Sequence, residues 1–142
     1  MSAERHPVRP HFLLVGDSTD LPAIRRMLER LPVAAYGQVF VEIASRVQIQ
    51  RFEVPEGVSL TWLLRDGVGD GAARRMAPRG ECVVRAVHAW FDEWMFEGGQ
   101  QAPRVVWIGC SASPRVSRLH RELRARFPLL GGDDRHAPVR GA

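Results

Sequence analysis

The sequence predicts an α/β fold, an open and mostly parallel sheet of four to five strands with helices on both faces. Short apolar runs alternate along the chain with segments whose apolar residues recur at helical spacing. The length of 142 residues, with 45% hydrophobic and 25% charged residues, is typical of one globular domain. We expect this domain at residues 11–130, after a disordered leader at 1–10 and before a flexible tail at 131–142.

The first strand and the first helix follow directly on the leader. His11 to Val15 is an apolar run that stops at Gly16-Asp17-Ser18-Thr19-Asp20, which is typical of a buried strand that ends in a turn. From Pro22 to Leu31, apolar residues recur at helical spacing with Arg and Glu opposite them. We therefore expect a helix there, capped by Thr19 or Asp20, with its proline in the first turn.

Two further strands are expected at Val39 to Ile43 and at Val58 to Leu64. The connection between them, Ala44 to Gly57, lacks helical periodicity and predicts no long helix. The next connection, Asp66 to Gly80, contains four glycines and a proline. This composition predicts a mobile loop.

The second half of the chain predicts a helix, a strand and a second helix. The strongest helical pattern of the chain runs from Glu81 to Phe96. A strand at Val105 to Gly109 and a helix from Pro114 to about Phe127 follow. In the Glu81 to Phe96 helix, four side chains are expected to face the core: Val84, Val87, Phe91 and Trp94.

The composition excludes several classes of function. All 20 basic residues are arginine, and the lack of lysine excludes Schiff-base chemistry and a P-loop lysine. Cys82 and Cys110 form no spacing motif, so we expect neither a metal site nor a disulfide scaffold. A net charge of +4 and a pI near 10.3 favour an anionic small molecule, whereas interspersed acidic residues argue against nucleic acid. Near the N-terminus no apolar run reaches the length of a signal sequence or membrane span, so we expect a cytoplasmic protein.

In open parallel sheets, ligands bind outside the carboxyl ends of the strands. This rule selects four segments before any motif is considered: Gly16 to Pro22, Ala44 to Arg51, Arg65 to Gly71 and Gly109 to Pro114. In the first segment, Gly16 lets a ligand approach the backbone, and the hydroxyls of Ser18 and Thr19 can bind a pyrophosphate at the start of the helix. An ordinary turn with a helix cap explains the same residues equally well.

Four segments of the chain carry a more specific pattern. Leu14 to Ile24 reads L-V-G-D-S-T-D-L-P-A-I, Gly37 to Ile43 reads as a strand, Leu60 to Arg65 reads L-T-W-L-L-R, and Val106 to Gly109 reads V-W-I-G. In this order they resemble the C-terminal domain of the siderophore-interacting protein family, the flavin-dependent ferric-siderophore reductases. That domain opens with G-D-E-T-A-L-P-A-I and continues through T-W-L-H-R and V-W-x-A-G-E. The resemblance spans about residues 11–127.

The resemblance implies a ferredoxin-reductase-like module that binds NADPH or NADH. In that module Gly16, Asp17, Thr19 and Pro22 correspond to the signature turn beside the nicotinamide and the pyrophosphate. The chain departs from the family at Ser18, which stands in place of the signature glutamate. Only ten residues precede the first strand, where the family has its flavin-binding barrel, so we expect that FAD is not bound by this chain alone.

Residues after the second and fourth strands complete the candidate site. Arg46 and Arg51 occupy the place where doubly wound folds discriminate the ribose 2′ position; an arginine there favours NADPH, and solvated arginines are the alternative. After the fourth strand, Gly109, Cys110 and Ser111 are candidate cofactor-binding residues, although the family has a glutamate at Cys110. Cys110 is either a thiolate favoured by the next helix or a small buried thiol. The sequence assigns no catalytic residue.

Two functions are consistent with these observations. In one, the chain is the NAD(P)H-binding part of a split flavin-dependent ferric-siderophore reductase. In the other, it is a non-redox binding or interaction module, or an enzyme recruited to a biosynthetic pathway, with a degenerate dinucleotide pocket.

The aromatic terminal strand of the family, which ends in a Y-W-R type motif, has no match in Leu129 to Ala142. A free-standing domain leaves apolar surface, which we expect at Trp90 to Phe96 and Leu129-Leu130, covered in a homodimer or by a separate flavin-binding protein.

Overall fold

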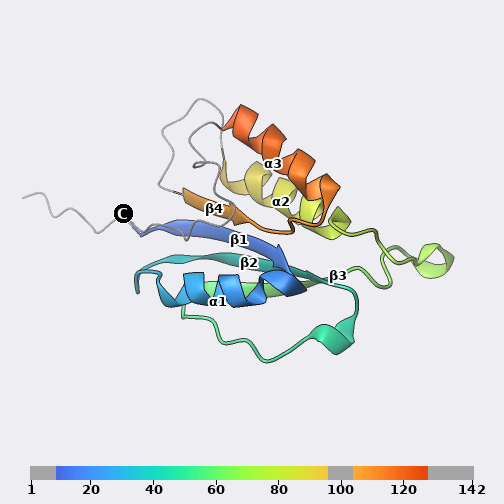
Figure 1. The fold of residues 1–142 in the computed structure, drawn as a ribbon, viewed down its shortest axis with the longest axis horizontal. Coiled ribbons are helices and arrows are strands. Elements are labelled where there is room, and N and C mark those ends of the chain that lie inside the picture. Colours follow the sequence, from blue (N-terminus) through green and yellow to red (C-terminus); the bar gives the residue numbers. More distant parts are fainter. Residues whose placement is uncertain (1–8, 96–103, 128–142) are drawn as a thin grey trace, which may run out of the picture.

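The computed structural model describes residues 9–95 and 104–127. Its four strands form one parallel sheet in the order β3-β2-β1-β4, with helices on both faces (Figure 1), which confirms the predicted fold class. The strands are β1 His11–Asp17, β2 Tyr36–Ile43, β3 Val58–Leu64 and β4 Arg104–Ile108. The helices are α1 Leu21–Glu29, α2 Glu81–Trp94 and α3 Pro114–Arg126. None of the helices in the described ranges has the length and hydrophobicity that crossing a membrane requires.

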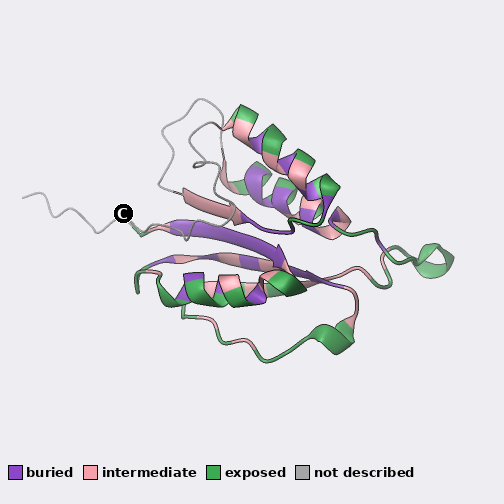
Figure 2. Cartoon of the chain, in the orientation of Figure 1, coloured by how far each residue is buried: buried purple, intermediate pink, exposed green. Residues whose placement is uncertain are grey.

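Strand β1 lies at the centre of the fold. Leu13 and Val15 pack on the side of α2 and α3, whereas Phe12 and Leu14 pack on the side of α1. All four side chains are fully buried, and the strand is a nearly continuous buried band in Figure 2. Burial on both faces explains why β1 is apolar at successive positions instead of at alternate ones.

The element boundaries differ from the prediction by a few residues. β2 begins at Tyr36, which pairs with His11 at the start of β1. α1 ends at Glu29 instead of Leu31, because the proline that follows Leu31 disfavours helical backbone at the preceding residue. As predicted, the connection after β2 holds no long helix, only a short 3-10 turn at Arg46–Gln48.

The connection after β3 projects from the body of the molecule (Figure 1). It is more ordered than its glycine content suggests, because Val68 and Arg75 form an antiparallel bridge around a 3-10 turn at Gly71–Ala73. Arg75 also contacts Glu81 at the start of α2, with its Nη2 2.9 Å from Oε2.

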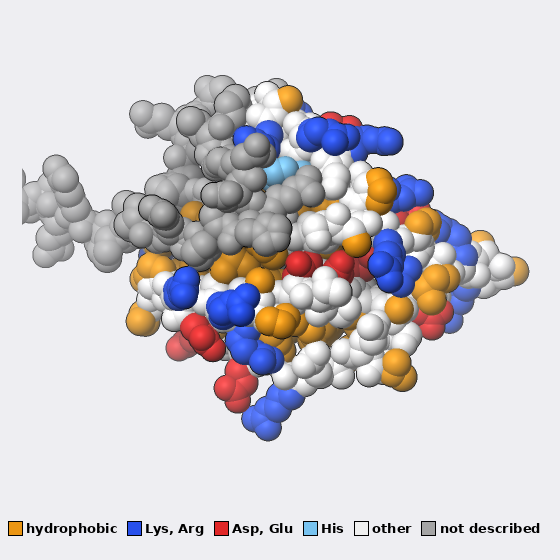
Figure 3. Space-filling view, viewed as in Figure 1, with side chains coloured by type: hydrophobic (Ala, Val, Ile, Leu, Met, Phe, Trp, Pro, Cys, Tyr) orange, Lys and Arg blue, Asp and Glu red, His pale blue; other side chains and the backbone are white. Residues whose placement is uncertain are grey.

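Over the face shown in Figure 3, arginine and acidic side chains are interspersed and form no single basic patch.

Helix α2 is rotated relative to the predicted orientation. Val87 and Phe91 are buried as expected, but Val84 and Trp94 are only half-buried, whereas Trp90 is buried with 3% of its surface exposed. The cause is a wider buried face, since α2 packs on both the sheet and α3. The indole N–H of Trp90 donates to Oε1 of Gln38 at 2.6 Å. The expectation that Trp90 belongs to an uncovered apolar surface is therefore wrong.

Two other parts of that expected surface, Phe96 and Leu129-Leu130, lie outside the described residues. The same holds for the leader up to residue 8 and for the tail at 131–142. Among the described residues, the most exposed large apolar side chains are instead Val33 and Val47, which lie in connections on either side of β2. They lie beyond opposite ends of β2 and therefore do not form one continuous patch.

His11 is buried at the amino end of β1, with 1% of its surface exposed. Its ring stacks on Tyr36 with centroids 4.5 Å apart, and the ring of Trp94 meets its edge at 4.7 Å. Neither ring nitrogen has a hydrogen-bond partner. Burial, followed by the charge of Arg104, lowers the pKa of His11 below its ordinary 6.5, although the side chain of Gln38 opposes this shift.

We predict that His11 makes the fold less stable in mild acid. Well above pH 6.5 the imidazole is neutral in both the folded and the unfolded chain, so stability is fully retained. Below that pH the unfolded chain takes up the proton first, and the free energy of unfolding should fall by about 1 kcal/mol for each pH unit until the folded ring is protonated. Urea unfolding followed by tryptophan fluorescence between pH 7.5 and 5.5 tests this. A His11→Phe variant should lose the pH dependence, and an equal dependence in both proteins would contradict it.

Candidate functional site

The carboxyl ends of the four strands meet around a cavity of about 130 Å³. Its lining includes Ser18 after β1, Ala44 after β2, Arg65 after β3 and Cys110 after β4. Two larger grooves, of about 520 and 700 Å³, lie elsewhere, between α1 and the segment 51–58. We place the candidate site at the smaller cavity because it collects polar side chains from all four strand ends, as ligand sites of parallel sheets do.

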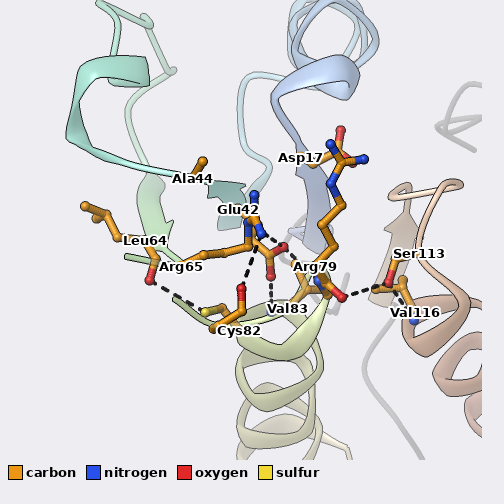
Figure 4. Close-up of polar contacts among 12 residues, drawn as sticks. Asp17, Glu42, Ala44, Leu64, Arg65, Arg79, Cys82, Val83, Ser113 and Val116 are labelled. Carbon is orange, nitrogen blue, oxygen red and sulfur yellow. Dashed lines mark hydrogen bonds and ion pairs between the residues drawn. The ribbon is translucent and has the colours of Figure 1, made fainter. Parts of the chain in front are cut away.

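Glu42, on β2, is the buried acid of this edge (Figure 4). Its Oε1 accepts the N–H of Gly80 at 2.8 Å, and its Oε2 accepts the N–H of Val83 at 3.1 Å. The Nε of Arg65 lies 3.9 Å from Oε1. The carboxylate therefore caps α2 from a strand, because the first N–H groups of a helix have no partner within the helix and its dipole favours negative charge there. Glu42 was not among the site residues predicted from the sequence, although a charged residue inside an apolar strand is a usable signal.

Ser113 connects the starts of α2 and α3. Its Oγ accepts the N–H of Val116 at 3.4 Å and so caps α3, while its hydroxyl donates to the carbonyl of Arg79 at 3.2 Å. Gly80 has a φ of 88°, and a Cβ on it would lie 2.2 Å from Oγ of Ser113. Glycine is required there both by the left-handed backbone and by the close approach of the serine.

The turn after β1 is closed by its own aspartates. Oδ1 of Asp17 accepts the N–H and the hydroxyl of Thr19, at 2.9 and 2.5 Å. Oδ2 of Asp20 accepts the N–H groups of Asp17 and Cys110, each at 2.9 Å. The expectation that Thr19 or Asp20 caps α1 is wrong: Asp17 caps the preceding 3-10 turn, Ser18–Asp20, and α1 has no side-chain cap.

Gly16 and Gly109 lie on either side of the Asp20 side chain. A Cβ on Gly16 would lie 2.6 Å from Cβ of Asp20, and one on Gly109 would lie 2.6 Å from its Cγ. The two glycines thus leave a slot between β1 and β4, and the Asp20 carboxylate fills it. Sequence reasoning expected Gly16 to admit a ligand, and in the structure it admits a side chain of the same chain.

Cys110 is a buried thiol at the end of β4, with 2% of its surface exposed. Burial raises its pKa far above the ordinary range, and the carboxylates of Asp17, Asp20 and Glu42 raise it further. The thiol therefore stays protonated, which favours its packing role over a reactive thiolate. Ligand atoms of Asp17, Asp20 and Cys110 lie within 4.8 Å of one another, but the hydrogen bonds of the two aspartates already account for this cluster.

The comparison with protein families decides the identity of the domain. The family model of siderophore-interacting proteins matches residues 9–129. The chain belongs to the siderophore-interacting protein family. A siderophore utilization protein from T. fusca has a similar structure, with a TM-score of 0.59 and 30% identity over 86% of this chain and 41% of that protein. The siderophore-interacting protein from Acinetobacter baumannii, with a TM-score of 0.56 and 14% identity over 94% and 46%, shows the same fold.

Curated relatives of this siderophore-interacting domain cover less of its sequence. Uncharacterized proteins of Mycobacterium bovis and Mycobacterium tuberculosis are 36% identical to it over 64 residues, which is 45% of this chain and 23% of each relative. The chain thus covers less than half of the length of these relatives and of the two similar structures. The resemblance inferred from four sequence segments is confirmed at the level of the family and its fold.

In this family member, the structure brings together only some of the candidate residues. Four of them line the cavity: Asp17, Ser18, Thr19 and Cys110. Ser111 and Pro22 are exposed: Ser111 follows β4 by three residues, and Pro22 lies in the first turn of α1. Arg79, which sequence reasoning missed because it lies in the glycine-rich connection, also lines the cavity and extends toward Asp17 (Figure 4).

The two arginines after β2 lie in different places. Arg46 begins a 3-10 turn whose Gln48 lines the cavity, and the amide oxygen of Gln48 accepts the N–H of Ala44 at 2.6 Å. Arg51 lines the groove beside α1 instead. There its Nη2 lies 3.8 Å from Oε1 of Glu53, and both side chains are almost fully exposed. Of the two, Arg46 is the one that lies near the candidate site.

We predict that Glu42→Ala lowers the free energy of unfolding by about 2–4 kcal/mol. The substitution leaves the N–H groups of Gly80 and Val83 and the guanidinium of Arg65 without their buried acceptor. Urea unfolding of the purified variant measures the loss. Glu53→Ala removes an exposed acid from a solvated ion pair and should cost less than about 1 kcal/mol. Similar losses of unfolding free energy in the two variants would show that the contacts of Glu42 at the start of α2 do not stabilise the fold by this amount.

Proposed function

We propose that this chain is the NAD(P)H-binding domain of a split, flavin-dependent ferric-siderophore reductase. It binds NADPH or NADH at the carboxyl edge of the sheet, and a flavin held by a separate protein takes up the hydride and reduces the ferric chelate. The observation that carries the proposal is the cavity at which all four strand ends meet, in a chain of this family. Open parallel sheets bind nucleotides at this edge.

The residues at the edge fit part of a dinucleotide. A cavity of about 130 Å³ suits one ring, since pockets that enclose a whole ligand are several times larger. Beside the cavity, the hydroxyl of Ser18 and the exposed guanidinium of Arg79 are donors for phosphate oxygens. The rest of the dinucleotide would lie on open surface, so we expect weak binding.

A second candidate function is a non-redox binding or interaction module with a degenerate pocket. The carboxylates of Asp17 and Asp20 favour it, because they stand in the turn where a pyrophosphate would bind and repel phosphate charge. The two functions differ in a simple measurement. Binding of neither NADPH nor NADH at millimolar concentration would contradict the first function and support the second.

We predict that the chain binds NADPH more tightly than NADH and that Arg46 is the reason. A charge-assisted contact to the 2′-phosphate is worth roughly 1.5–3 kcal/mol, so Arg46→Ala should lower NADPH affinity about tenfold or more and leave NADH affinity unchanged. Titration calorimetry with both nucleotides measures this. Arg51→Ala is the matched control, since Arg51 lines the groove beside α1, and it should change neither affinity. An unchanged preference in Arg46→Ala would remove the role of Arg46.

We also predict that the purified chain is colourless. No flavin-binding barrel is present in the described ranges, and the proposal assigns the flavin to a separate protein. An absorption spectrum checks this, because oxidised flavins absorb at roughly 350–500 nm. Flavin bands at a stoichiometric level would contradict the proposal that a separate protein holds the flavin. If the chain instead forms a homodimer and carries no flavin, the proposal that it binds a dinucleotide is unaffected.

A further inference from the structure

A carboxylate of the chain itself, that of Asp20, bridges the ends of β1 and β4. β1 leads into α1 on one face of the sheet and β4 leads into α3 on the other, so the two connections diverge beyond Asp17 and Cys110 (Figure 1). At this point the N–H groups of Asp17 and Cys110 converge on one oxygen, Oδ2 of Asp20, each at 2.9 Å. Backbone donors that converge on a single oxygen are how proteins hold oxyanions.

The backbone around this oxyanion leaves room for it. Gly16 and Gly109 border it, and a Cβ on either residue would approach Asp20 to 2.6 Å. Cys110 has a φ of 57°, a left-handed conformation that is rare outside glycine and brings its N–H to the carboxylate. Within residues 9–95 and 104–127, no arginine or histidine forms an ion pair with Asp20. The backbone donors are thus its main stabilising partners.

We infer that Asp20 is a built-in competitor for phosphorylated ligands, because its carboxylate holds the two backbone donors that a phosphate oxygen of a bound dinucleotide would otherwise use. This inference rests on the proposed function and makes Asp20 the residue that sets the affinity of the edge for phosphate. A ligand has to displace the carboxylate or bind outside it, beside the negative charges of Asp17 and Asp20. Burial raises the pKa of Asp20, an effect the two N–H bonds only partly oppose, so the carboxylate is not held as tightly as its contacts alone suggest.

The test is to remove the competitor and measure the affinity for phosphate. Asp20→Ala empties the slot, and Asp20→Asn keeps an oxygen for the two N–H groups but removes the charge. Asp92→Asn is the matched control, since Asp92 is exposed near the far end of α2 and the substitution changes the net charge equally. Titration calorimetry with inorganic pyrophosphate and with NADPH, in buffer without divalent metals, gives the affinities, and circular dichroism reports whether each variant is folded.

We expect both probes to bind Asp20→Ala at least about fivefold more tightly than Asp92→Asn, with Asp20→Asn in between. A purely structural role for Asp20 predicts unchanged or weaker binding, and that result in a folded variant would overturn the inference. If Asp20→Ala does not fold, Asp20→Asn decides by the same criterion.

The outcomes for this inference and for the proposed function are distinct. If the unmodified chain binds NADPH and the Asp20 variants bind it no better, the inference fails and the proposed function stands. If the unmodified chain binds no dinucleotide but Asp20→Ala does, the inference stands and the function proposed for the native chain fails. If neither probe binds any of the proteins at millimolar concentration, both fail.

Discussion

The architecture of the carboxyl edge depends on one buried charge, the carboxylate of Glu42. A strand residue that accepts the N–H groups of Gly80 and Val83 fixes where α2 begins, because the start of the helix cannot move away without leaving that charge unpartnered. Arg65, 3.9 Å away, extends the same constraint to the end of β3. The Glu42 side chain thus connects β2, which carries it, to the residue that follows β3 and to the start of α2. Glu42, Arg65 and Gly80 all line the cavity at this edge.

Other side chains at this edge also satisfy backbone groups at the ends of strands and helices. Ser113 caps α3 and bonds the carbonyl that precedes α2, Asp20 satisfies the ends of β1 and β4, and Asp17 closes the turn between β1 and α1. Backbone donors that a parallel sheet usually presents to a nucleotide are therefore largely occupied by the chain itself. A ligand at this edge has to be recognised mainly by side chains, such as the exposed guanidinium of Arg79.

The order of elements and the family were predictable from the sequence, because both depend on local patterns: apolar runs, helical periodicity and the segment Leu14 to Ile24. The polar network was not, since it joins residues such as Glu42 and Gly80 that are 38 positions apart. The buried face of α2 was predicted wrongly for a related reason. Trp90 is in the core because α2 packs on both the sheet and α3, and the helical periodicity of α2 alone does not show that the helix has two packing partners. Arg51 follows β2, as a residue of the predicted site should, but it lines the groove beside α1 instead of the cavity.

The two carboxylates that bind backbone donors differ in how firmly they are held, and this difference assigns them different roles. Glu42 is nearly inaccessible to solvent, faces the positive end of a helix and has an arginine beside it, so its removal affects the fold. Asp20 is half-buried and has no ion-pair partner among the described residues, and burial raises its pKa. A phosphate oxygen can satisfy the N–H groups of Asp17 and Cys110 as well as a carboxylate can, whereas displacing Glu42 would leave Arg65 without its buried counter-charge. If a phosphorylated ligand binds at this edge, we therefore expect it to exchange with the carboxylate of Asp20 and not with that of Glu42.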